Sequence, residues 1–248
     1  MKREHIILAC VGLFLLAGVL IPIFAINSTA GASASDQFDI IGVYGEAEIL
    51  AEPDSAKVIL AVETTHETAK KAVEENARLT NAVLDALAEL GLDKEQCKTS
   101  SYQLNSFTQT DPKNKEKYIT KYQAYNELNV SLSNLDEVGN VIDTAVAAGA
   151  NRVLSVYFER KDADNLKLMA LQNATQQAKA KAEAIAAGAG ITIKGVKVIY
   201  EEMTGYTPYR ADMNENFQVM KAVADMAPTP MLPDDVKVTA RVKVDYFF

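Results

Sequence analysis

Apolar and polar positions alternate along the chain from residue 40 onward, which is the pattern of half-buried β-strands. The first alternating stretch covers residues 40–51, and a second covers 56–62, after a turn at Pro53 and Asp54. One face of each stretch is apolar, formed by Ile41, Val43, Gly45, Ala47, Ile49 and Ala51 in the first and by Ala56, Val58, Leu60 and Val62 in the second. Because a short turn joins them, we expect these two strands to pair as a hairpin.

Three segments instead carry apolar residues at the spacing of amphipathic helices. Gly91 follows the first segment and can adopt the left-handed conformation that ends a helix. Asn134 can cap the second segment while Glu137 reaches back to it, and Gly188 and Gly190 end the third. These expected helices cover residues 68–90, 134–149 and 164–187.

Further alternating stretches predict five more strands, and the last of them has the clearest pattern. They are expected at residues 96–109, 117–133, 152–160, 193–203 and 235–248, with a turn at 111–114 between the first two. The order is therefore ββ-α-ββ-α-β-α-ββ. Because hairpins alternate with helices, we predict an α+β fold in which a largely antiparallel sheet packs against long helices on one face. Residues 36–248 are expected to form this one domain.

The first 35 residues differ from the rest of the chain. Residues 6–26 contain no charged side chain and follow Lys2 and Arg3. A helix of this length spans about 30 Å, enough to cross a bilayer, whereas the apolar core of a cleaved signal has about 7–15 residues. The length favours an uncleaved membrane anchor. Small residues at 30–34 leave a cleaved signal peptide as the alternative.

The basic residues around this segment predict its orientation. Lys2 and Arg3 precede it, and the next basic residue is Lys57. Because basic flanks stay on the cytoplasmic side, residues 36–248 are expected outside the cytoplasm. The protein is then extracytoplasmic, either anchored to the membrane or secreted or periplasmic.

Composition and charge exclude several classes of protein. Of the 248 residues, 48% are apolar and 23% charged, as in globular proteins. The 25 Lys and Arg face 33 Asp and Glu, a net charge of −8 that argues against a nucleic-acid partner. Beyond residue 35, Cys97 and His66 are the only cysteine and histidine, too few for a disulfide framework or a zinc site. We expect Cys97 to be buried.

One set of residues could suggest a hydrolytic triad: His66 with Ser55 and Asp54. It has no nucleophile elbow or comparable motif, and a lone histidine here is expected to be a solvated surface residue. Residues 188–190 follow a helix, which excludes a dinucleotide fingerprint. Residues 162–165 lack the glycine and distal glutamate of a calcium loop and are interpreted as a helix cap. We therefore predict no catalytic, cofactor-binding or metal-binding residues, and no enzyme.

Alanine recurs every fourth residue in the third helix. Such steps turn a helix by about 400°, so the stripe winds by about 160° over its length and is not expected to face one flat sheet throughout. One interpretation is that alanine is a good helix former, partly packed on the core. The other is that part of the stripe, including Ala178, contacts a second subunit. The stripe consists of Ala170, Ala174, Ala178, Ala182 and Ala186.

Methionines gather in the weakly patterned segment 205–232. Met213, Phe217 and Met220 have the spacing of one face of a short helix, and flexible methionine suits an adaptable contact surface. Copper binding by the thioethers is the alternative. We favour packing or assembly, so the predicted assembly surface contains Ala178, Met213, Phe217 and Met220.

Seven short features keep a characteristic order and spacing. They are Ile41 to Gly45; Pro53 and Asp54 with Ala56; the helix face of Ala69, Ala72 and Asn76; Thr99 to Tyr102; Tyr122, Ala124 and Asn126; Gly149 and Ala150 leading to Phe158; and the alanine-rich helix. Together they resemble the SIMPL domain family, over nearly all of residues 39–248. The chain departs from the family at residues 233–235, where Pro-Asp-Asp replaces the usual Pro-Gly before the last strand.

The resemblance implies an extracytoplasmic bacterial envelope protein with α+β subunits, which in some members assemble into large hollow oligomers. It also implies an association with oxidative-stress tolerance, and it supplies no catalytic residues. We therefore expect a non-enzymatic, oligomeric envelope protein whose partners are copies of itself and the membrane, reached through residues 6–26. The alternative is a hydrolase or ligand-binding protein whose site is formed at subunit contacts.

Overall fold

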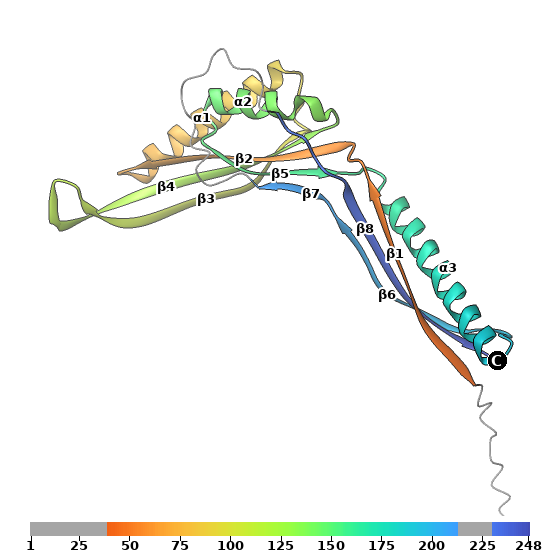
Figure 1. Ribbon diagram of the computed structural model, residues 1–248. Helices are drawn as coiled ribbons and strands as arrows, with labels where there is room; N and C mark the ends of the chain where they lie inside the picture. The colour runs from red at the N-terminus through yellow and green to blue at the C-terminus, as the bar shows by residue number, and fades with distance from the viewer. Residues whose placement is uncertain (1–38, 213–229) are drawn as a thin grey trace, which may run out of the picture. The chain divides into compact units, whose positions relative to one another are not determined.

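The computed structural model describes residues 39–212 and 230–248, which fold into three helices and two antiparallel sheets (Figure 1). The described residues belong to one compact unit. The predicted α+β class is confirmed, but the strands are divided between two sheets, whereas one sheet was expected. Each sheet has its own apolar core.

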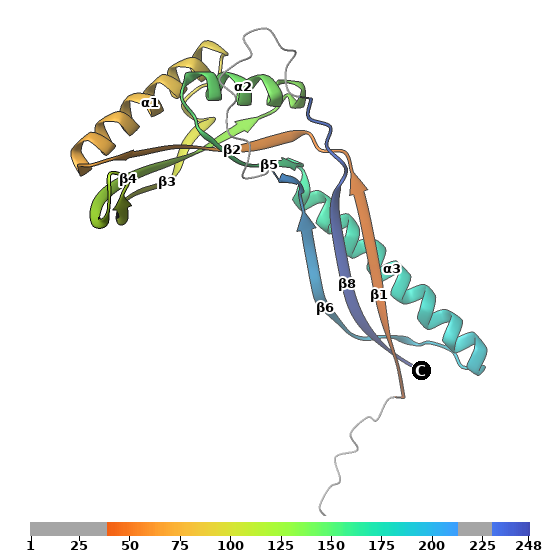
Figure 2. The ribbon, with the colours of Figure 1, turned by 60° about the vertical axis from the view of Figure 1, so that its left-hand side comes forward.

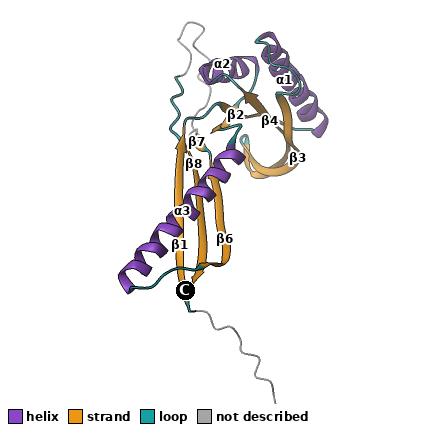
Figure 3. Cartoon of the chain, turned by 90° about the vertical axis from the view of Figure 1, so that its right-hand side faces the viewer, coloured by secondary structure: helices purple, strands orange, loops and turns teal. Residues whose placement is uncertain are grey.

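The three-stranded sheet contains β1 (Ile40–Ala51), β8 (Val236–Phe247) and β6 (Gly195–Thr207), in the order β1-β8-β6. The helix α3 (Ala163–Ala189) lies against one face, mainly over β1 and β8 (Figure 3). The alternating residues of β1 and β8 form the core with the alanines of α3. The other face is therefore the one that carries the charged residues of the strands.

The five-stranded sheet has the order β3-β4-β2-β5-β7. The helices α1 (Ala69–Glu89) and α2 (Val138–Ala148) pack on it, and α2 follows a short 3-10 turn at Leu135–Glu137 (Figure 2). Its core contains the apolar faces of the central strands and of both helices. The strands are β3 (Cys97–Asp111), β4 (Asn114–Leu132), β2 (Ser55–His66), β5 (Arg152–Glu159) and β7 (Tyr209–Asp212), and β7 was not predicted.

The expected hairpin between the first two strands is wrong. β1 pairs with β8, so that Ile41 lies opposite Tyr246, while β2 pairs with β4 and β5. Residues 52–54 carry the chain from one sheet into the other. Alternation of apolar residues specifies which face of a strand is buried, but it does not specify which other strand pairs with it.

All five alanines of the stripe on α3 are buried within the subunit, at 4% exposure or less. The interpretation that part of the stripe contacts a second subunit is therefore wrong, and the stripe packs on the core. Sheets twist with a fixed hand, so a long helix can keep a winding stripe in contact with a twisted sheet. Ala178 is fully buried here, which removes it from the predicted assembly surface.

Several predicted helix ends are found. Gly91 after α1 and Gly190 after α3 both have positive φ angles, of 89° and 69°. Asn134 accepts a hydrogen bond from the backbone N–H of Asp136, but it caps the 3-10 turn and α2 begins only at Val138. Asp162 precedes α3 without capping it, because its carboxylate binds Arg160 instead.

Two predicted features lie outside the described residues: the apolar segment 6–26 and the group of Met213, Phe217 and Met220. Among the helices of residues 39–212 and 230–248, none has the length and apolar character needed to span a bilayer.

Candidate functional site

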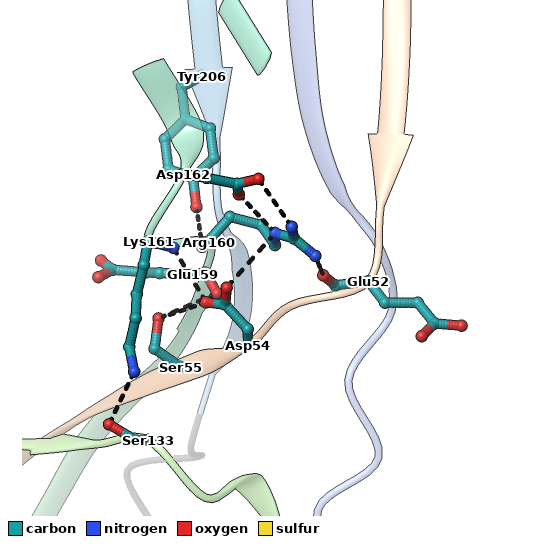
Figure 4. A network of polar contacts seen from close by, with 9 residues as sticks. All are labelled: Glu52, Asp54, Ser55, Ser133, Glu159, Arg160, Lys161, Asp162 and Tyr206. Atoms are coloured by element: carbon teal, nitrogen blue, oxygen red, sulfur yellow. Dashed lines mark hydrogen bonds and ion pairs between the residues drawn. The ribbon is translucent and has the colours of Figure 1, made fainter. Parts of the chain in front are cut away.

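The polar side chains of Figure 4 meet where the chain passes between the two sheets. The Arg160 guanidinium donates two hydrogen bonds to the Asp162 carboxylate, at 2.8 and 2.9 Å, and a third to the backbone carbonyl of Glu52 at 3.0 Å. The backbone N–H of Arg160 donates to the Tyr206 hydroxyl at 2.8 Å. This arginine therefore joins the β1–β2 connection, the start of α3 and strand β6.

Asp54 is the second centre of this junction. It accepts a hydrogen bond from the backbone N–H of Lys161 at 2.9 Å and one from the Ser55 hydroxyl at 3.2 Å. Its other carboxylate oxygen lies 3.6 Å from the Arg160 guanidinium. Asp54 thus links the β1–β2 connection to the residues between β5 and α3. Asp162 holds the Arg160 guanidinium, which also binds Glu52 of the β1–β2 connection.

Hydrogen bonding also perturbs ionisation here. The hydrogen bonds from Arg160 lower the pKa of Asp162, and the same pairing raises the pKa of Arg160. Burial raises the pKa of the Tyr206 hydroxyl. Each shift favours the form already present at neutral pH, so the junction is suited to a fixed structural connection and poorly suited to proton transfer.

The triad considered from the sequence does not form. Ser55 begins β2 and His66 ends it, so the strand separates them by roughly 36 Å. The Ser55 hydroxyl donates instead to Asp54 and to the backbone carbonyl of Glu159. His66 is half-buried, whereas a solvated residue was expected.

A buried polar layer attaches α1 to the five-stranded sheet. The Asn76 amide donates to the backbone carbonyls of Val62, at 2.7 Å, and Ala124, at 3.1 Å. The Thr64 hydroxyl donates to the carbonyl of Ala72 at 2.7 Å. Asn76, Ala72 and Ala124 belong to the stretches that carry the family resemblance, so these stretches specify how a helix packs on the sheet.

An open depression of about 470 Å³ lies between α3 and β6. It exists because α3 covers β1 and β8 but little of β6, which leaves Val196 and Ile199 half exposed. Lys179 and Glu183 of α3 line it, and the Lys179 Nζ atom lies 3.8 Å from Oε1 of Glu183. Within the described part of the chain, no group of three or more His, Cys, Asp or Glu side chains could hold a metal ion.

The ribbon formed by β3 and β4 extends beyond the other strands of its sheet (Figures 1 and 2). β2 accompanies β4 only from Tyr122 to Leu132, so the rest of the ribbon has two strands. Most side chains of β3, and most of those of β4 before Tyr122, are exposed, including aromatic ones: Tyr102 is 51% exposed and Tyr118 75%. This surface was not predicted from the sequence, although residues 99–110 of β3 contain no charged residue.

Cys97 begins β3 and is half-buried, so its predicted burial is only partly met. Burial raises the pKa of its thiol. A thiol that stays protonated is a weak nucleophile, so Cys97 does not resemble a reactive cysteine.

Comparison with known proteins identifies the family of the chain. The family model of SIMPL, described as a protein of unknown function (DUF541), matches residues 41–246. Two relatives, from Brucella melitensis and Brucella abortus, are each named "26 kDa periplasmic immunogenic protein". Each is 30% identical over 164 residues, which cover 65% of this chain and 66% of the relative. From the extent of the family match, the chain belongs to the SIMPL family.

Proposed function

We propose that this chain is an extracytoplasmic envelope protein without enzymatic activity, which works as an assembly of its own copies. An extracytoplasmic location is supported by the periplasmic location in the names of the two relatives and by the basic residues before segment 6–26. We propose further that segment 6–26 is not cleaved and anchors the protein in the membrane.

The exposure of the β3–β4 ribbon is the observation that supports self-assembly. A two-stranded ribbon is marginally stable in water when neither face is covered. Here Phe107 is 39% exposed and Tyr118 75%, and they lie on a part of the ribbon that β2 does not accompany. Association with another copy would bury these side chains and stabilise the ribbon.

The absence of enzymatic activity is supported by the use of the polar groups at the junction. Asp54, Ser55 and Arg160 all bind backbone or side-chain groups of neighbouring segments. Each of them is thereby committed to joining the sheets, and His66 lies at the far end of β2.

A second candidate function is a ligand-binding protein or hydrolase whose site is completed at subunit contacts. The depression beside α3 favours it, because Val196 and Ile199 are half exposed and a neighbouring subunit could close it. Assays with generic ester, phosphate and peptide substrates test this alternative. Hydrolysis by the purified protein that Glu183→Gln, in the lining of the depression, abolishes would replace the proposed function.

We also propose a contribution to oxidative-stress tolerance, which is supported only by the resemblance to the SIMPL family. The half-buried Cys97 thiol, with its raised pKa, does not support a thiol-based mechanism. Cells that lack the protein should then survive peroxide less well, and Cys97→Ser should restore survival as fully as the original chain. Equal survival of deficient and normal cells would remove this part.

Light scattering on the purified full chain tests the assembly. The proposal requires a particle heavier than the 27.0 kDa of one chain.

A further inference from the structure

We propose that two copies of this chain pair through the free edge of β3, in antiparallel orientation, so that the five-stranded sheet of one copy continues into that of the other. This inference rests on the proposed self-association and names the strand that carries it. β3 is the outermost strand of its sheet, and its inner edge pairs with β4. Its outer edge therefore presents backbone N–H and C=O groups that another strand can bind.

The composition of β3 makes this edge unusual. Residues 99–110 contain no charged residue, no proline and no glycine. Between irregularities at Thr99/Ser101 and Thr110/Asp111 the pairing with β4 is regular. A long, regular and uncharged edge is the kind that proteins otherwise avoid, because any exposed strand can pair with it.

The other sheet edges of the described residues are each protected. β1 carries Glu46 and Glu48, β7 has only four residues, and the part of β4 that β2 does not accompany carries Lys115, Glu116 and Lys117. The register of β6 shifts twice, between Val196/Val198 and Glu201/Met203, and these irregularities interrupt a regular edge within the strand. The contrast singles out β3 as the edge that remains open to pairing.

Charge favours a second copy as the occupant. The chain carries a net charge of −8, so two copies repel each other wherever like charges face across a contact. Pairing between residues 101–110 of two copies places only uncharged side chains opposite one another, so no like charges meet across this contact. Such side chains form favourable cross-strand pairs, and a two-fold arrangement satisfies both edges at once.

A matched pair of substitutions tests this edge. Thr108 of β3 and Thr120 of β4 lie directly opposite each other in the ribbon, and both are exposed. Thr108→Lys brings a charge to the free edge of β3, whereas Thr120→Lys brings the same charge to the paired strand β4 on the same face. In sedimentation of the full chain we expect Thr108→Lys to weaken the association about tenfold and Thr120→Lys to leave it nearly unchanged.

Cysteine scanning supplies a second measurement that does not depend on the charge variants. In the Cys10→Ser, Cys97→Ser chain, single cysteines replace residues 101–109 in turn, and the protein is oxidised. In an antiparallel pair, a residue and its own copy move apart along the strands by about 7 Å for each position between that residue and the two-fold axis. A disulfide forms only when the two Cα atoms lie within about 7 Å of each other. Cross-linking should therefore reach a single maximum along β3 and vanish three residues away.

The outcomes separate this inference from the proposed function. An oligomer that survives Thr108→Lys and shows no cross-linking along β3 overturns the edge pairing and leaves self-association intact. Equal cross-linking at every position indicates parallel strands and also contradicts the two-fold arrangement. A wild-type chain that is a monomer overturns both proposals.

Discussion

Gly45 of β1 lies against the backbone of α3 at Ala174, so closely that a Cβ atom at residue 45 would collide with the Ala174 carbonyl oxygen. The contact is made where the alanine stripe crosses the strand, and small residues on both sides allow it. Gly45 belongs to the first stretch of the family resemblance. This close approach fixes how α3 packs on the three-stranded sheet.

Gly45→Ala should therefore destabilise the protein, because the atoms that its methyl group meets are backbone and cannot move aside as a side chain can. We expect a loss of about 2–4 kcal/mol in the free energy of unfolding, measured by urea denaturation followed by circular dichroism. Gly188→Ala is the control, since a Cβ at residue 188 meets nothing within 4 Å. A neutral Gly45→Ala would contradict the close packing.

Ala178→Glu should unfold the subunit and not merely separate an assembly. Ala178 is fully buried against the sheet, so the new carboxylate would lie in an apolar core and cost about 3–5 kcal/mol. Ala180→Glu adds the same group at an exposed position two residues away on α3 and should leave the fold intact. Circular dichroism combined with light scattering distinguishes unfolding from a folded monomer, and the latter would return Ala178 to the subunit surface.

Stability should fall in acid partly through Asp162. Because Arg160 lowers the pKa of this carboxyl in the folded chain, the pair stabilises the fold above the unfolded pKa of about 4. The contribution disappears as the pH falls through the lower, folded value. Asp162→Asn should therefore lower the urea midpoint at pH 7 and reduce its further fall between pH 5 and pH 2. Asp85→Asn, on an exposed part of α1, removes the same charge outside the junction and should keep the full acid dependence.

Local features of the fold could be predicted from the sequence, and the pairing of distant strands could not. The positions of α1, α3 and β8 follow from periodicity within each segment, and Gly91 ends α1 as expected. The neighbour of β1 is β8, at the other end of the chain, and the alternation within β1 contains no information about it. The four-residue β7 is too short for any pattern.

The candidate surfaces were predictable only in part, for the same reason. The uncharged run at 99–110 is visible in the sequence, but its position at a sheet edge depends on the order of five strands. Arg160 was missed because its partners, Glu52 and Tyr206, come from other segments of the chain. Conversely, Ala178 was assigned to a possible contact because the twist of the sheet beneath α3 was not foreseen.

The location outside the cytoplasm is open to a direct test. A reporter that is active only outside the cytoplasm, fused after Phe248, should be active, because Lys2 and Arg3 retain the N-terminus inside. Activity of a reporter restricted to the cytoplasm would contradict the prediction. N-terminal sequencing of the native protein distinguishes an anchor, with Met1 or Lys2 intact, from a cleaved signal, with a start near Ser33 or Ser35.

Self-association is the central claim, and the mass of the full chain in solution tests it most directly. Light scattering coupled to size-exclusion chromatography, with any detergent contribution subtracted, measures the protein mass of the particle at micromolar concentration. We expect a discrete mass that is a multiple of the 27.0 kDa chain, or of the shorter chain that remains if the signal is cleaved. A monodisperse particle of one chain would contradict it.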